Sequence, residues 1–149
     1  MTTLNLIRRA GAAEIEAIKA LVREVVEETY GHLWEVPPYN LDQDDWPQAL
    51  VAVVGKGLAG VVLTQDAFIS DLWVRRPLRS KGVGAALLAS AEAEIAARGH
   101  RHALLQVIET NRRAVAFYTW HGWHMTKCLP HETLPVNRLT MGKALAPLN

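Results

Sequence analysis

The sequence predicts an α/β (α+β) fold in a single domain, with a central mixed, mostly antiparallel sheet and helices on both faces. Runs in which apolar and polar residues alternate, typical of strands, are interleaved with runs whose apolar residues recur every three or four positions, typical of helices. Two valine-rich runs flank a tight turn at Gly55-Lys56-Gly57, which indicates an antiparallel hairpin. Phe68–Val74 is joined to His102–Ile108 through a helix, and such a crossover connects parallel strands.

The individual elements follow from the same patterns, taken along the chain. We expect strands at residues 5–10, 49–54, 58–64, 68–74, 102–108, 123–129 and 138–145. We expect helices at residues 12–30, from about residue 85 to 98, and from Asn111, a good helix cap, to about residue 120. Residues 31–48 contain three prolines and form a long loop with room for a short helix.

Length and composition limit the classes of protein. The 149 residues suit one domain, residues 1–149, which buries about two-thirds of its unfolded surface. A formal net charge of +1 gives no electrostatic reason to expect nucleic acid as a partner. The chain begins without a signal-type apolar core, and its longest apolar-rich region, residues 49–63, is too short to span a membrane. With a single cysteine, Cys128, we expect a cytoplasmic protein without a membrane partner.

The region after Phe68–Val74 has the pattern of an anion-binding loop. Pro77 ends the strand, and Arg79-Ser80-Lys81-Gly82-Val83-Gly84 leads directly into an amphipathic helix. Glycines let the backbone approach a ligand, and the first N–H groups of a helix have no partner within it. Together with the basic side chains, this arrangement favours a phosphate-bearing ligand. A plain glycine turn with solvated basic residues explains the loop alone equally well.

Three stretches together resemble a known family. They are Asp71-Leu-Trp-Val74, the glycine loop, and Asn111-Arg-Arg-Ala-Val-Ala-Phe-Tyr118-Thr-Trp-His-Gly-Trp123. They resemble the two main sequence blocks of the GNAT superfamily of acetyl-CoA-dependent N-acetyltransferases, and the order of elements matches that fold over nearly the whole chain. Trp123 stands where the family usually has Phe, and Trp73 where Tyr or another apolar residue is frequent.

The resemblance implies acetyl-CoA as co-substrate, bound in a cleft flanked by the parallel strand pair. The residues that it implies for the coenzyme are Leu72, Trp73, Val74, Arg79, Ser80, Lys81, Gly82, Val83, Gly84, Asn111 and Phe117. A helix cap explains Asn111 nearly as well. A backbone N–H near Trp73 or Val74 is expected to hold the thioester carbonyl oxygen.

Acetyl transfer to an amine needs an acid for the departing thiolate and a base for the amine. The resemblance places Tyr118 near the coenzyme sulfur as general acid, and a phenol stays protonated at neutral pH. Asp71 and Glu109 are the candidates for the base, acting directly or through water. The alternatives are a core aromatic for Tyr118 and ordinary polar strand residues for the two acids.

The acceptor is expected to be a primary amine, on a small molecule or a peptide, that attacks directly in a ternary complex. In this fold the segment that corresponds to residues 31–48 usually lines the part of the cleft that binds the amine. The candidate substrate-binding residues are Trp34 and Tyr39 in this segment and Asp71 on the later strand. The segment also carries the acidic residues Glu35, Asp42, Asp44 and Asp45. Acids and aromatic faces attract cations, which predicts an acceptor with a second positive charge. A solvated acidic loop is the alternative.

Two other kinds of protein remain open. A catalytically silent acyl-CoA-binding module would use the same loop, although Tyr118 favours an enzyme. A small metal-binding interaction domain would use His121, His124, Cys128 and His131, but their positions around a turn and a strand end argue against convergence, so no metal is expected. Association of two copies of the chain as a homodimer is a further open alternative.

Overall fold

The computed structural model describes residues 6–79 and 81–146, and these residues form one seven-stranded sheet. Its strands are β1 (Leu6–Arg9), β2 (Leu50–Val54), β3 (Gly57–Gln65), β4 (Phe68–Val74), β5 (His102–Ile108), β6 (His124–Pro130) and β7 (Asn137–Ala144), in the order β1-β2-β3-β4-β5-β7-β6. The pair β4–β5 is parallel and the other described pairs are antiparallel. The predicted mixed sheet is confirmed.

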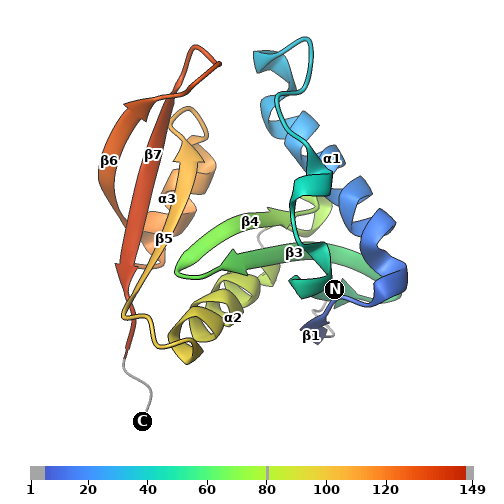
Figure 1. The fold of residues 1–149 in the computed structure, drawn as a ribbon. Helices are drawn as coiled ribbons and strands as arrows, with labels where there is room; N and C mark the ends of the chain where they lie inside the picture. The colour runs from blue at the N-terminus through green and yellow to red at the C-terminus, as the bar shows by residue number, and fades with distance from the viewer. Residues whose placement is uncertain (1–5, 80, 147–149) are drawn as a thin grey trace.

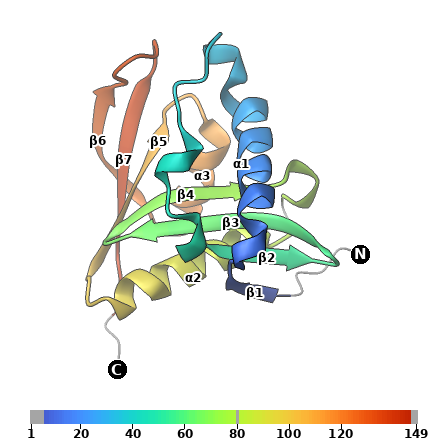
Figure 2. The same cartoon turned by 45° about the vertical axis from the view of Figure 1, so that its right-hand side comes forward.

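Three α-helices in the described residues cover the two faces of this sheet (Figures 1 and 2). They are α1 (Ile15–Tyr30), α2 (Val83–Ala97) and α3 (Arg112–Trp120). Strand β3 shows how the faces are divided, because Val61 and Leu63 pack in a core with α1, whereas Val62 between them packs in a core with α2. This alternation follows from the period-two geometry of a strand.

Helix α2 begins at Val83, two residues before the predicted start, with Gly82 as its cap in the left-handed region at φ +85°. The apolar side chains at its helical three-and-four spacing are buried: Val83, Leu87, Leu88, Ala91 and Ile95. Two acids of α2, Glu92 and Glu94, are partly covered. Glu92 accepts from Trp123 Nε1 and Lys143 Nζ, and Glu94 accepts from Thr64 Oγ1 and Arg98. These bonds tie α2 to the sheet by polar as well as apolar contacts.

Strands β4 and β5 separate after a very short parallel ladder. Phe68 pairs with Leu104 and Ile69 with Leu105, and no further pair between these strands occurs in the described residues. In the pairing of β4 with β3, Leu63 faces Asp71 and Thr64 faces Ile69, which leaves Ser70 as an extra residue. Such a bulge bends its strand. The bend lies directly after the last β4–β5 pair, and the two strands diverge from there (Figures 1 and 2).

Residues 31–48 are ordered by three 3-10 turns rather than by one short helix. The turns are η2 (Gly31–Leu33), η3 (Leu41–Gln43) and η4 (Trp46–Gln48). Leu41 and Trp46 are buried beside α1, and Trp46 Nε1 donates to the carbonyl of Leu41 at 2.7 Å. This anchoring holds the residues between the two side chains against the sheet.

Among the helices that the structure describes, none has the length and apolar character needed to cross a membrane.

Candidate active site

A cavity of about 730 Å³ lies where the second half of β4 meets the start of α2 and the face of α3. We call it the glycine-loop cavity. Its lining includes eight of the residues that the sequence assigns to the coenzyme: Leu72, Trp73, Val74, Arg79, Gly82, Gly84, Asn111 and Phe117. Lys81 is exposed and lies outside this lining, Val83 is buried in the core, and Ser80 lies outside the described residues. The glycine loop therefore faces a hollow large enough for a ligand.

The charge and geometry of this cavity suit an anion at the start of α2. A glycine at position 82 avoids the strain that a side chain would meet at φ +85°. The first N–H groups of α2 follow directly, at the positive end of the helix dipole. Arg79 is half-buried at the same wall, and Arg113 on α3 adds a second guanidinium to the lining. Arg113 was not among the residues expected from the sequence, although its place after the Asn111 cap was a usable signal.

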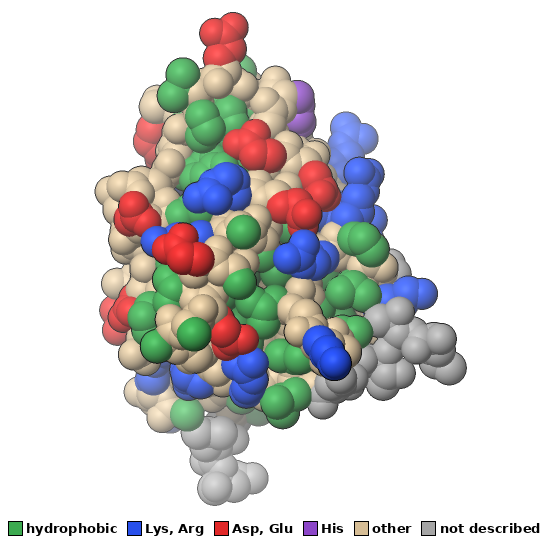
Figure 3. Space-filling view, turned by 90° about the vertical axis from the view of Figure 1, so that its right-hand side faces the viewer, with side chains coloured by type: hydrophobic (Ala, Val, Ile, Leu, Met, Phe, Trp, Pro, Cys, Tyr) green, Lys and Arg blue, Asp and Glu red, His purple; other side chains and the backbone are tan. Residues whose placement is uncertain are grey.

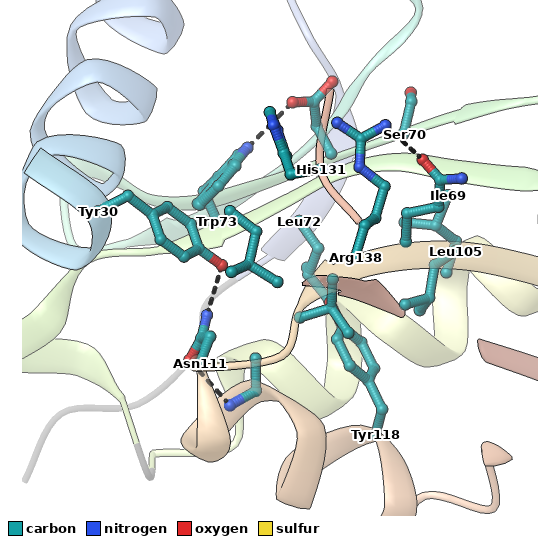
Figure 4. Close-up of a pocket in the computed structure, with 15 residues that line it drawn as sticks. Tyr30, Ile69, Ser70, Leu72, Trp73, Leu105, Asn111, Tyr118, His131 and Arg138 are labelled. Atoms are coloured by element: carbon teal, nitrogen blue, oxygen red, sulfur yellow. Dashed lines mark hydrogen bonds between the residues drawn. The ribbon is translucent and has the colours of Figure 1, made fainter. Parts of the chain in front are cut away.

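A second cavity, of about 320 Å³, opens between the diverging strands β4 and β5. We call it the Asp71 cavity. Its lining includes Asp71 on β4, Tyr30 at the end of α1, His131 after β6 and Arg138 on β7. Figure 4 shows Trp73, His131 and Arg138 on one side of it, and Asn111 and Tyr118 on the other. Its polar groups thus come from elements far apart in the sequence.

The two cavities share part of their walls. Both are lined by Leu72, Trp73, Asn111, Ala114 and Tyr118. Tyr118 is buried, with 9% of its surface exposed, and burial raises the pKa of its phenol far above the ordinary value. The hydroxyl therefore stays protonated at neutral pH. A protonated phenol at the junction of two cavities can donate to a group that enters from either side.

Asp71 is the one carboxyl among the described residues that line the Asp71 cavity. Trp73 Nε1 donates to its Oδ1 at 3.0 Å, whereas its buried Oδ2 finds no donor among the described residues. Burial, opposed by the Trp73 bond and reinforced by the nearby Asp44 carboxyl, raises the pKa of Asp71 to about 7. A carboxyl in this range can accept a proton near neutral pH, as a general base must.

Asn111 joins α3 to α1 across the floor of both cavities. Its Oδ1 accepts from the backbone N–H of Ala114 at 3.2 Å, which is the predicted helix cap. Its Nδ2 also donates to the hydroxyl of Tyr30 at 2.7 Å (Figure 4). The side chain is therefore a cap and a cavity wall together, and Tyr30 is a cavity residue that sequence reasoning missed.

Three predicted site residues lie away from both cavities. Glu109 is exposed, and its carboxylate accepts from Asn137 Nδ2 at 3.3 Å and lies 3.7 Å from Cys128 Sγ, on the side of β6 and β7. Trp34 and Tyr39 pack edge to face and donate to the carboxylate of Glu27 on α1, at 3.4 and 3.0 Å. Of the four candidate base and substrate-binding residues, Asp71 alone lines one of the two cavities.

The histidines and the cysteine have separate surroundings. His121 packs on the ring of Phe117, and Cys128 lies near Glu109. His131 Nδ1 accepts from the backbone N–H groups of Thr133 and Leu134, each at 3.1 Å, which leaves its hydrogen on Nε2. In the described part of the chain no three His, Cys, Asp or Glu side chains gather as a metal site would require.

Comparisons with known proteins show the family of this chain. Residues 19–123 match the model of the Acetyltransferase (GNAT) family. A curated peptidyl-lysine N-acetyltransferase, YiaC of Escherichia coli K12, is 27% identical over 83% of this chain and 86% of its own length.

Solved structures share the fold. A ribosomal-protein-alanine N-acetyltransferase from Brucella melitensis matches with a TM-score of 0.78 and 21% identity, covering 95% of this chain and all, 100%, of its own. YncA, a putative acetyltransferase from Salmonella typhimurium solved with acetyl-CoA, matches with a TM-score of 0.78 and 17% identity, covering 97% of this chain and 95% of its own. Because the family model spans well over half of the sequence, the chain belongs to the GNAT family of acetyl-CoA-dependent N-acetyltransferases.

Proposed function

We propose that this enzyme moves the acetyl group of acetyl-CoA to a primary amine by direct attack within a ternary complex. The observation that carries the proposal is the junction of the two cavities. The glycine-loop cavity has the anion-binding features that a coenzyme needs, and the Asp71 cavity has a carboxyl with a pKa near neutrality. Tyr118 borders both, at the point where a thioester and an amine would meet.

In this proposal the coenzyme lies along β4 with its phosphates at the start of α2. Gly82 and Gly84 leave room for them, and Arg79 and Arg113 supply positive charge. The second half of β4 pairs with β3 on one side and lacks a strand partner on the other among the described residues, so its amide groups can bind a ligand as an added strand would. A backbone N–H near Trp73 or Val74 would then hold the carbonyl oxygen.

When bound, acetyl-CoA supplies an acetyl thioester that an amine can attack. Asp71 takes a proton from the amine, and its pKa of about 7 makes the transfer from an ammonium group less uphill than for an ordinary aspartate. Tyr118 gives its proton to the sulfur as the C–S bond breaks. Burial weakens Tyr118 as an acid, but the same low-polarity surroundings also raise the proton affinity of a thiolate, so the two remain matched.

The relatives named above favour a peptide amine as the acceptor, and a small primary amine is the alternative. A second positive charge on the acceptor has less support. Asp42 is paired with Lys19 at 2.7 Å, and Glu35 and Asp45 are exposed away from the Asp71 cavity lining. The face that carries α1 shows acidic and basic side chains interspersed (Figure 3), which weakens any single-sign attraction.

The experiment that tests the function is turnover of acetyl-CoA with a panel of acceptors, followed by release of free thiol. The panel contains lysine-bearing peptides, peptides with a free N-terminus and small primary amines. Acceptor-dependent thiol release supports the proposal. Binding of acetyl-CoA without turnover of any amine would instead support the silent acyl-CoA-binding module.

A further inference from the structure

We infer that Asp44 is a positioning residue for the base, because it shares with Asp71 the proton that the acceptor amine gives up. The inference rests on the proposed function for its role in turnover, while the pairing of the two carboxyls can be measured without turnover. Asp44 belongs to the segment between η3 and η4, and Asp71 to β4. No local pattern in the sequence connects the two.

Leu41 and Trp46, on either side of Asp44, and Trp73 on β4 belong to one hydrophobic cluster, so the segment that carries Asp44 lies against β4. The two carboxyls are close enough for each to perturb the pKa of the other. When both are ionised, both are acceptors only, and the buried Oδ2 of Asp71 has no donor among the described residues. Among the described residues, Trp73 is the one hydrogen-bond donor to ionised Asp71. A proton held between the two carboxyls supplies a second donor. A shared proton is the usual solution when two carboxylates occupy one site.

The fold holds Asp44 in place. The N–H of Asp44 donates to the carbonyl of Leu41, and the buried side chains of Leu41 and Trp46 anchor the chain on both sides of it. Asp44 itself is half-buried, whereas its neighbours Asp42 and Asp45 are exposed. Burial raises the pKa of Asp44, opposed by its bond to Asp71, which agrees with a carboxyl turned toward the sheet.

Every proton in the proposed reaction has a donor and an acceptor. Ionised Asp71 and Asp44 take one proton from the ammonium group, giving a neutral amine and one shared proton. The amine lone pair forms the C–N bond, the C–S bond breaks, and the thiolate takes the proton of Tyr118. The nitrogen releases its second proton, which restores the phenol, and the shared proton leaves to solvent with the product.

Other charged or titratable groups also face this cavity. They are Tyr30 from α1, Tyr118 from α3, His131 from the segment after β6, and Arg138 from β7. Arg138 is paired with Glu132 at 2.8 Å and with Gln106 Oε1 at 3.2 Å. A kinetic pH profile alone would therefore mix several groups, so the test needs a reporter bound to Asp71.

The indole N–H of Trp73 is that reporter, because it donates to Asp71 Oδ1. In ¹H–¹⁵N spectra of the free wild-type protein we expect this resonance, assigned with Trp73→Phe, to titrate near pH 7, and to lose that titration in Asp71→Asn. In Asp44→Asn the midpoint should fall by about one pH unit, because a like charge is removed and an amide donor stabilises ionised Asp71. Asp45→Asn, with the same change of charge one residue away, should leave the midpoint in place.

The same variants are then assayed for kcat/KM between pH 5.5 and 9 with one primary amine. We expect the acid limb of the profile to move to lower pH in Asp44→Asn and to stay in place in Asp45→Asn. An unchanged Trp73 midpoint in Asp44→Asn, or equal shifts in the two variants, would overturn the pairing even if the enzyme is active. A shifted midpoint in a protein without acetyl transfer would refute the proposed function and leave the pairing in place.

Discussion

At the scale of single residues, the proposed mechanism gives Tyr118 and Asp71 opposite proton tasks, and burial would prepare both because it acts on the two groups in the same direction. Burial raises the pKa of each group. For a phenol, this keeps the proton on at neutral pH, ready to be donated. For a carboxyl, it brings the proton-accepting range up to pH 7. One poorly solvated junction thus provides a proton donor and a proton acceptor.

We expect Tyr118→Phe to lower kcat by about 10²- to 10⁴-fold, because general-acid catalysis typically contributes that much. Affinity for acetyl-CoA should change little, since the hydroxyl is used only as thiolate charge develops. Steady-state kinetics and calorimetric titration measure the two effects. Tyr39→Phe is the matched control, because that hydroxyl bonds Glu27 outside both cavities. A loss of less than about threefold, with chemistry rate-limiting, would return Tyr118 to a packing role.

Asp71 also makes stability depend on pH. Its pKa is raised in the folded protein to about 7 from an ordinary value of 3.8, so the folded state binds the proton more tightly than the unfolded state. The associated stability is present below pH 4 and is lost as pH rises through 7. We therefore expect the free energy of unfolding of Asp71→Asn, measured relative to that of the wild type, to rise from pH 5 to pH 8.5. The expected rise is on the order of 2 kcal/mol.

Chemical denaturation at the two pH values measures this gain, with Asp45→Asn as the exposed control. If the stability difference between Asp71→Asn and wild type is the same at both pH values, the pKa of Asp71 is not raised in the folded protein.

At the scale of elements, the cleft depends on two backbone features. The bulge at Ser70 bends β4 away from β5 immediately after their second pair. Gly82, in the left-handed region, turns the chain into α2 so that the helix starts at the cavity wall. Neither feature is a catalytic group, yet in the proposed mechanism the first opens the amine side and the second forms the anion site.

We expect Gly82→Val to weaken acetyl-CoA binding in a folded protein, because a side chain at φ +85° is strained and the loop amides must shift. A Cβ at this position meets no atom within 4 Å, so the core stays intact. Gly99→Val is a closely matched control. Gly99 follows the other end of α2 at φ +94°, also without an atom within 4 Å of a built Cβ. Equal affinities for acetyl-CoA in the two variants by calorimetry would refute the loop assignment.

At the scale of the whole molecule, the distribution of charge gives little long-range attraction for a cation. The formal net charge is +1. The face that carries α1 alternates in sign, through pairs such as Lys19–Asp42 and Arg75–Glu24, each at 2.7 Å. The Asp71 cavity itself contains Arg138 as well as Asp71.

We therefore expect a diamine and a neutral-tailed monoamine of equal length to show the same dependence of kcat/KM on ionic strength. Measurements at low and high salt, at constant pH, test this. A steeper fall for the diamine would restore the hypothesis that residues 31–48 select a second positive charge.

The sequence by itself determined the parts of the site that are built from neighbouring residues. These parts are the glycine loop, the Asn111 cap and the position of Tyr118 on α3. Each depends on spacing within one helix or one strand–loop–helix unit. Apolar residues that recur every three or four positions in helices, and every two in strands, show such spacing directly. The parallel placement of β5 beside β4 followed from the length of one crossover and is confirmed.

The tertiary structure alone decided which distant side chains meet. Four acids of residues 31–48 look alike in sequence, and only the burial of Leu41 and Trp46 selects Asp44 as the one that reaches Asp71. Glu109 and Asp71 were equivalent candidates, but the ladder of β5 with β7 continues through the N–H of Glu109 to Asn137 while β4 bends away. The side chain of Glu109 therefore follows β7 rather than the cleft. Periodicity shows which face a residue occupies, but the groups packed opposite that face are set by bulges and long-range contacts that it does not encode.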